Sequence, residues 1–122
     1  MGYRSEVTAV FYAQGVDEWP LLKLFVAENF PKDLAEYVEE VHNRDTSGFV
    51  FRVAEYKWYE SFPEVQAFEE FERKFTRMEK CINGTWAFEF ARIGEDYNDI
   101  ENRSTDHAGY VISVVRRVEI DF

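Results

Sequence analysis

The chain has 122 residues, which is the usual size of a single domain. It carries 24 acidic and 14 basic side chains, a formal net charge of −10, and this excess of negative charge argues against a protein that binds the phosphates of nucleic acid or anionic lipid. Hydrophobic residues make up 46% of the chain and include 12 Phe, so we expect one globular domain over residues 1–122 with a substantial core.

The N-terminal stretch and the cysteine content bear on the compartment. MGYRSEVTAV lacks the basic segment and apolar stretch of a signal peptide, and no apolar run approaches the roughly 18 residues of a membrane span. Cys81 is the only cysteine, so no internal disulfide can form. These features predict a cytoplasmic protein that does not associate with membranes.

The first third of the chain predicts one strand and two helices. Residues 3–13 (YRSEVTAVFYA) alternate between apolar and polar side chains, the pattern of a half-buried strand. An apolar stripe with Pro20 in its first turn then predicts a short helix that ends near Asn29. Apolar residues recur every three or four positions over residues 31–42, which predicts a second helix. Its outward face would carry four acids, Asp33, Glu36, Glu39 and Glu40.

Residues 48–59 (GFVFRVAEYKWY) predict a long strand whose apolar pattern changes phase near Ala54. Two explanations are open. Either a bulge lies near Ala54, or the aromatic pair Tyr56 and Trp58 is exposed on the opposite face.

The longest helix is predicted over residues 62–80, where phenylalanine recurs at helical spacing and Ser61 and Glu64 have the spacing of a capping box. Residues 85–93 and 109–120 alternate as two further strands. The predicted order is therefore β-α-α-β-α-β-β. This order favours an α+β fold, a four-stranded and largely antiparallel sheet with helices packed on one face.

An acidic segment joins the last two predicted strands, from Gly94 to His107, and it is longer than a hairpin turn requires. Surplus loop often carries function, so its acids are candidate interaction residues. They are Glu95, Asp96, Asp99 and Glu101. Their spacing fits an EF-hand loop poorly, so we expect a solvated acidic loop and no metal site, with cation binding by these acids as the alternative.

No catalytic motif is present in the sequence. It has no P-loop, no dinucleotide-binding glycine pattern, no zinc-protease motif and no nucleophile elbow. Nothing in the sequence brings Cys81 near either histidine, His42 or His107. We therefore expect a protein that is not an enzyme and needs no cofactor. A glycosidase-like pair of carboxylates, which leaves no motif, is the enzymatic alternative.

Three short blocks, MGYRS at the N-terminus, KWY at 57–59 and RIGEDYNDIE at 92–101, together resemble a set of small proteins encoded by tailed bacteriophages and prophages. The blocks lie in the same order and are spread over the whole chain. The resemblance brings no assigned activity with it. It implies a phage origin, and therefore the cytoplasm of a host cell, but not a mechanism.

In that setting the acidic surface favours an accessory protein that acts by protein-protein contact. We expect a basic host protein as the partner, either a nucleic-acid-binding protein or a defence protein. The carboxylates would occupy its phosphate-binding positions and inhibit it stoichiometrically. We expect no direct binding of nucleic acid. The candidate surfaces are the loop acids, the acids of the helix predicted over 31–42, and the aromatic pair Tyr56 and Trp58. The alternative is a structural domain that forms a homodimer through the exposed aromatic strand.

Overall fold

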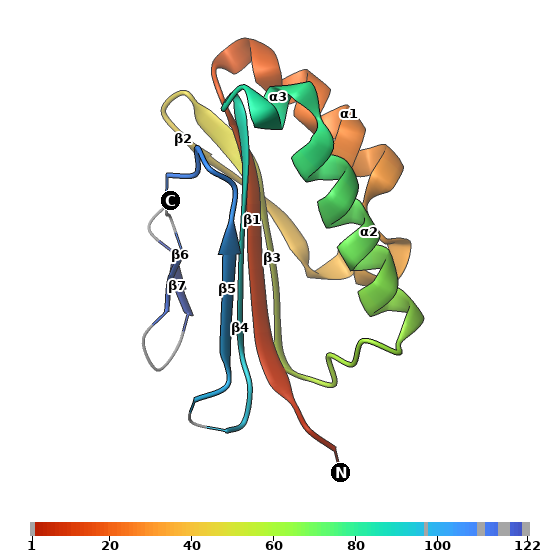
Figure 1. The fold of residues 1–122 in the computed structure, drawn as a ribbon. Coiled ribbons are helices and arrows are strands. Elements are labelled where there is room, and N and C mark those ends of the chain that lie inside the picture. The colour runs from red at the N-terminus through yellow and green to blue at the C-terminus, as the bar shows by residue number, and fades with distance from the viewer. Residues whose placement is uncertain (1, 97, 110–111, 115–117, 121–122) are drawn as a thin grey trace.

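The computed structural model describes residues 2–96, 98–109, 112–114 and 118–120 and has an α+β fold. One antiparallel sheet of five strands forms its centre, helices cover one face of the sheet, and a two-stranded hairpin lies on the other side (Figure 1). The predicted class and the placement of helices on one face are therefore confirmed, whereas the predicted number of four strands is too small.

In chain order the elements are β1 (Ser5–Gln14), the 3-10 helix η1 (Val16–Glu18), α1 (Trp19–Asn29), the 3-10 helix η2 (Lys32–Tyr37), β2 (Val38–Asn43), β3 (Thr46–Tyr56), α2 (Pro63–Arg77), α3 (Glu79–Ile82), β4 (Trp86–Ile93), β5 (Ile100–Ser104), β6 (Ile112–Val114) and β7 (Val118–Ile120). The large sheet has the strand order β2-β3-β1-β4-β5, and all its neighbours are antiparallel. β1 and β2 both run opposite to β3 and are joined through α1, while α2 joins β3 to β4 around β1. This is the split β-α-β connectivity of the ferredoxin-like arrangement, extended by β5 and the hairpin.

Phenylalanine fills the space between the sheet and the helices. Phe11, in the middle of β1, is fully buried, and its ring centroid lies 5.1 Å from that of Phe71 and 5.7 Å from that of Phe49. Helix α2 presents one stripe of buried side chains to this layer, Val65, Phe68, Phe71 and Phe75. Such aromatic pairs contribute about 0.5–1.5 kcal/mol each beyond the burial of their area. The helical period of the sequence thus predicts this face correctly.

Strand β1 is buried on both faces. The prediction of a half-buried strand, made from its alternating pattern, is therefore wrong. Val10 and Tyr12, which point away from the helices, are 0% and 3% exposed. Ala108 and Ile120, from the C-terminal part of the chain, belong to the cluster of side chains around them. The predicted strand over 109–120 is in fact the hairpin of β6 and β7, and residues 110, 111 and 115–117 of that prediction lie outside the described residues.

The predicted helix over residues 31–42 is also wrong. Lys32–Tyr37 form η2, and the chain continues as β2, which pairs with β3 through a tight turn at Arg44 and Asp45. Arg44 has a φ of 59°, the left-handed conformation that a two-residue hairpin requires. Asn-Gly or Asp-Gly usually marks such a turn, and neither is present here. The hairpin therefore left no recognisable signal in the sequence.

This correction separates the four acids that were expected on one helix. Asp33 and Glu36 lie on η2, and Glu39 and Glu40 lie on β2, the edge strand of the sheet. All four are exposed, as predicted, but successive residues of a strand point to opposite faces. They do not form a row on a rigid helix.

The phase change in β3 is a bulge. Ser5 pairs with Tyr56 and Val7 with Val53, so three steps on β3 oppose two on β1, and Glu55 has a φ of 53°. The extra residue turns Tyr56 back toward the helices, where it and Trp58 pack against the buried core. The alternative prediction, an aromatic pair exposed at an edge strand, is therefore wrong, because β3 lies inside the sheet and both rings are half-buried.

Helix α2 differs from its prediction at both ends. It begins without the predicted capping box, since its N-cap is Phe62 and Glu64 instead accepts a hydrogen bond of 2.8 Å from Tyr56 Oη. Burial and this hydrogen bond raise the pKa of Tyr56 to about 12. The chain leaves the helix at Met78 and re-enters it as α3. Among the described helices, none has both the length and the apolar character needed to cross a membrane.

Candidate functional site: an ionic groove between strand β5 and helix α2

The connection between β4 and β5 is shorter than the predicted loop from Gly94 to His107. Ile100–Ser104 pair with β4 as strand β5, which leaves residues 94–99 as the connection. The Gly94 N–H closes the turn by donating to the Asp99 carbonyl oxygen at 2.8 Å. Strand β5 is mostly polar (IENRS), so its sequence looks like a loop. The surplus length that singled out this segment is therefore absent.

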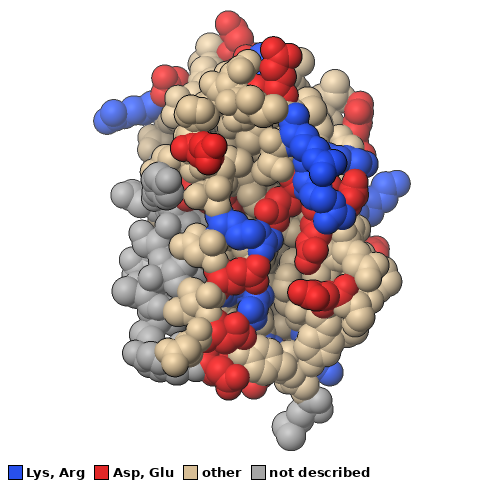
Figure 2. Space-filling model, viewed as in Figure 1, with Lys and Arg blue, Asp and Glu red and all other residues tan. Residues whose placement is uncertain are grey.

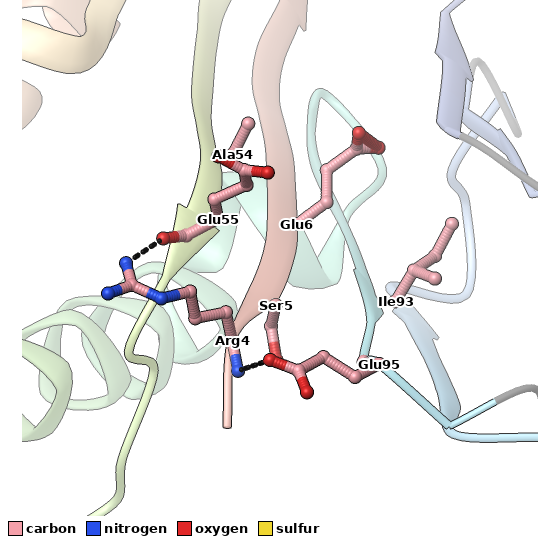
Figure 3. A pocket seen from close by; sticks show the side chains of 8 residues that line it. Arg4, Ser5, Glu6, Ala54, Glu55, Ile93 and Glu95 are labelled. Carbon is pink, nitrogen blue, oxygen red and sulfur yellow. Dashed lines mark hydrogen bonds between the residues drawn. The ribbon is translucent and has the colours of Figure 1, made fainter. Parts of the chain in front are cut away.

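Two acids of this connection are bound by groups of the protein itself. Asp99 accepts hydrogen bonds from Arg92 Nη2 at 2.7 Å and from Tyr3 Oη at 2.5 Å. Glu95 accepts the backbone N–H of Arg4 at 2.7 Å (Figure 3). A side chain at Gly94 would collide with Tyr3 Oη and the Asp99 carboxylate, so glycine permits this close approach.

The Arg92–Asp99 pair changes the titration of its members. Hydrogen bonds from Arg92 and then from Tyr3 hold the pKa of Asp99 below its ordinary value of 3.8. The hydrogen bond from Arg92 to Asp99 raises the pKa of Arg92, and the separate hydrogen bond from Tyr3 to Asp99 raises the pKa of Tyr3. Asp99 is therefore ionised at neutral pH and stabilises the turn.

Glu101 belongs to a second set of ion pairs, which joins β5 to α2. Arg103 donates to the two carboxylate oxygens of Glu72 at 2.7 and 3.0 Å and also pairs with Glu101. Its guanidinium lies 3.9 Å from the centroid of the Phe90 ring. Glu101 also accepts a hydrogen bond of 3.1 Å from Arg92 Nε, so it bridges the two arginines. Bidentate arginine-carboxylate pairs of this kind fix geometry as well as charge.

Between β5 and α2 the surface is hollowed by two adjoining cavities of about 340 and 260 Å³. We call them together the ionic groove, and the residues that line it are Tyr3, Trp58, Tyr59, Glu60, Glu69, Glu72, Arg73, Arg92, Asp99, Glu101 and Arg103. Figure 2 shows basic and acidic side chains alternating along β5. Five carboxylates and three guanidinium groups line the groove, so its formal charge is −2.

Two of these carboxylates differ from the others. Glu72, Asp99 and Glu101 are held by the arginines, whereas in the described part of the chain the carboxylates of Glu60 and Glu69 make no hydrogen bond or ion pair. Glu69 acts on Arg103 only through its charge, without a direct contact. Trp58 and Tyr59 line the same cavity as these two acids. The groove thus combines two unpaired carboxylates, aromatic rings and a floor of arginines already paired, which suits a cationic side chain.

A further cavity, of about 440 Å³, lies at the end of β1 (Figure 3). The side chains of Ala54 and Ile93 line it, and Arg4 crosses its rim to donate to the Glu55 carbonyl oxygen at 2.9 Å. Both the side chain and the backbone N–H of Arg4 are used in contacts within the protein, so this cavity offers less to a ligand than the ionic groove.

Of the remaining predicted site residues, Trp58 lines the ionic groove and the others lie outside it. Asp96 is exposed, and its backbone N–H donates to Tyr3 Oη at 3.0 Å. The four acids of η2 and β2 line no part of the groove. Tyr56 and Trp58 take part in the core, and Trp58 also lines the groove. Among the described residues, no group of His, Cys, Asp and Glu is arranged to hold a metal ion.

Sequence reasoning missed the arginines, although one signal was present. Arg92 has the same strand parity as Trp86, Phe88 and Phe90, the residues predicted to face the core. A charged residue in such a position needs a partner, which predicts a buried or half-buried ion pair. Arg103 carries no such signal, because the polar sequence of β5 predicts a loop.

Comparison of the chain with protein-family models, with curated proteins and with solved structures found no match.

Proposed function

We propose that this protein acts by protein-protein contact and binds a basic segment of its partner in the ionic groove. The observation that carries the proposal is the pair of unpaired carboxylates, Glu60 and Glu69, beside Trp58 and Tyr59 in one concave site. Because three sequence blocks resemble phage proteins, the partner that we propose is a basic protein of a host cell. The protein would inhibit it stoichiometrically by standing in for its nucleic acid.

The chemistry of the groove favours arginine over lysine as the group that it receives. A planar guanidinium can stack on an aromatic ring and bond to two carboxylates at once. A cation over an aromatic ring contributes about 0.5–1 kcal/mol at exposed sites. The paired Arg92 and Arg103 hold the floor of the groove in place before a ligand arrives, which lowers the cost of ordering on binding. Several such contacts would be needed for tight binding.

A charge-reversal experiment tests the site. The groove variant carries Glu60→Lys and Glu69→Lys, and the matched control carries Asp33→Lys and Glu36→Lys on η2. Each Glu→Lys or Asp→Lys change adds two charges, so both variants move the net charge from −10 to −6. Binding to a fluorescent arginine-rich peptide is measured by anisotropy at two salt concentrations, and circular dichroism checks the fold.

We expect the groove variant to bind the peptide at least about tenfold more weakly and the control to bind like the wild type. If both variants lose affinity equally, only the net charge matters and the groove is not the site. If neither loses affinity, the proposal is wrong. A pull-down from host lysate with the wild type and the groove variant then identifies the partner.

A further inference from the structure

Strand β2 forms one edge of the five-stranded sheet. A row of its backbone N–H and C=O groups therefore has no partner strand among the described strands. An edge strand of this kind can accept a further strand where its side chains permit it. The side chains of β2 decide which strand fits.

Charge along β2 is distributed unevenly. Its register with β3 places Val38, Glu40 and His42 on the face that carries the helices, and Arg44 follows in the turn. The first half of the strand therefore carries two carboxylates, and the second half carries an imidazole followed by the guanidinium of the turn. Within one copy, His42 Nε2 lies 3.6 Å from Glu40, and its Nδ1 lies 2.8 Å from Ser47 Oγ. The imidazole is thus held in a fixed orientation at the edge.

We propose that β2 pairs antiparallel with β2 of a second copy of this chain, about a two-fold axis at Val41. The axis places Val41 opposite Val41 of the second copy. Glu40 then faces His42 of the second copy, and the same contact occurs twice by symmetry. Each acidic half meets a basic half. An axis shifted by one residue to Glu40 would instead place two carboxylates opposite each other, which is destabilising.

A cavity beside the edge strengthens this pairing. It has a volume of about 340 Å³ and lies between β2 on one side and α1 and η2 on the other. Val26, Phe30, Val38 and Phe49 give it apolar walls, and the charged residues Lys32 and Glu40 also line it. The two-fold axis places Arg44 of the second copy opposite Val38. Its aliphatic stem can cover the apolar walls while its guanidinium reaches Glu40.

A pair of six-residue strands buries less area than the roughly 1,200–2,000 Å² of a stable complex, so a weak dimer is expected. Self-association should become visible at concentrations on the order of 100 µM. The dimer would join the two sheets into one and would leave the ionic groove free, because the groove lies at the other edge, beside β5.

Sedimentation velocity over a range of concentrations up to about 1 mM tests the proposal. The wild type should form a dimer, and Glu40→Lys should weaken it at least about tenfold, because it removes the carboxylate that faces His42 of the second copy and sets a lysine near Arg44 of that copy. The exchanged variant, Glu40→His with His42→Glu, restores opposite partners and should dimerise like the wild type. Asp33→Lys makes the same charge change outside the strand and should leave the dimer intact. Because Glu40 is exposed, thermal melting should show that all variants remain folded.

A wild-type chain that stays monomeric at 1 mM would overturn the proposal, and the charges of β2 would then serve to prevent strand pairing. A dimer that is indifferent to Glu40→Lys, or that the exchanged variant fails to restore, would also overturn it. The groove variant of Glu60 and Glu69 should dimerise normally, so failure of the groove and failure of the edge are separate results.

Discussion

Two groups of acids look alike in the sequence and differ in the structure. In the β4–β5 connection and β5, Asp99 and Glu101 are tied to Arg92 and Arg103. On η2 and β2 the acids are exposed, and among their described contacts only Glu40 takes part in ion pairs, at 4.0 Å from Lys23 Nζ and 3.6 Å from His42 Nε2. Clustered acids therefore indicate neither a free surface nor a ligand site. The position of the arginines decides which acids are available.

The difference also changes which acids are the best candidates for binding a partner. The sequence favours the loop acids as the interaction surface because their loop is long. In the structure, much of that loop is strand β5, and the ion pairs of Asp99 and Glu101 stabilise it. Two acids of the groove make no hydrogen bond or ion pair: Glu60 lies before helix α2, and Glu69 lies within it. Solvent exposure and pairing, rather than acid density, distinguish the two groups.

The largest expected effect comes from the core that both groups share. Phe71→Ala should lower the free energy of unfolding by about 3–5 kcal/mol, because it leaves a cavity among the rings of Phe11, Phe30 and Phe75. Urea denaturation followed by circular dichroism measures this loss. A loss below about 1 kcal/mol would contradict the packing of α2 on the sheet.

Arg103→Met sharpens the comparison between the two groups. The variant keeps an apolar stem over Phe90 but leaves Glu72 without its arginine and Glu101 with Arg92 alone. Since Arg103 is partly exposed, we expect a loss of about 2 kcal/mol, below the 3–5 kcal/mol of a fully buried pair. Lys23→Met, which removes the cation beside Glu40, is the matched control. Its effect should stay within about 0.5 kcal/mol, and equal losses in the two variants would break the comparison.

The pH dependence of stability tests the paired acid Asp99. The pKa of Asp99 is depressed in the folded state, so its contribution is present above the ordinary value of 3.8 and is lost as pH falls through the folded pKa. Asp99→Asn should cost about 1 kcal/mol at neutral pH and should melt with a shallower dependence between about pH 4 and pH 2. Identical slopes in the wild type and in Asp99→Asn would show that Asp99 gains nothing from Arg92.

The smallest effect is expected on η2. Asp33→Asn together with Glu36→Gln removes two exposed carboxylates that make no described ion pair. The free energy of unfolding should change by no more than about 0.5 kcal/mol, as is usual for surface substitutions. A loss above about 1 kcal/mol in urea denaturation would mean that these acids support the fold and are not a free surface.

Much of the fold follows from local patterns. The alternation of 3–13 and 85–93 predicts β1 and β4, and the phenylalanine period predicts α2 with its buried face. For the phase change near Ala54, the bulge is one of the two explanations that the sequence offers. These elements are readable because each buries one continuous apolar face, and the period of that face identifies the element.

The missed elements share a different property. Strand β2 has apolar residues at Val38 and Val41, a spacing that also fits a helix, and its turn at Arg44 lacks a glycine. Strand β5 is polar because it lies at an edge, where its ion pairs replace apolar contacts. Neither segment carries a period of its own, so pairing with a neighbouring strand determines its structure.

The sequence by itself determined the α+β class, the phenylalanine core, the strong negative charge and the identity of the acids. Only the tertiary structure decided which acids are paired, because an ion pair depends on distances between elements that are remote in the chain, such as Glu72 on α2 and Arg103 on β5. The same holds for the ionic groove, which brings Tyr3, Glu60 and Asp99 from three separate segments to one cavity. Periodicity reports the faces of single elements, whereas sites arise where faces of different elements meet.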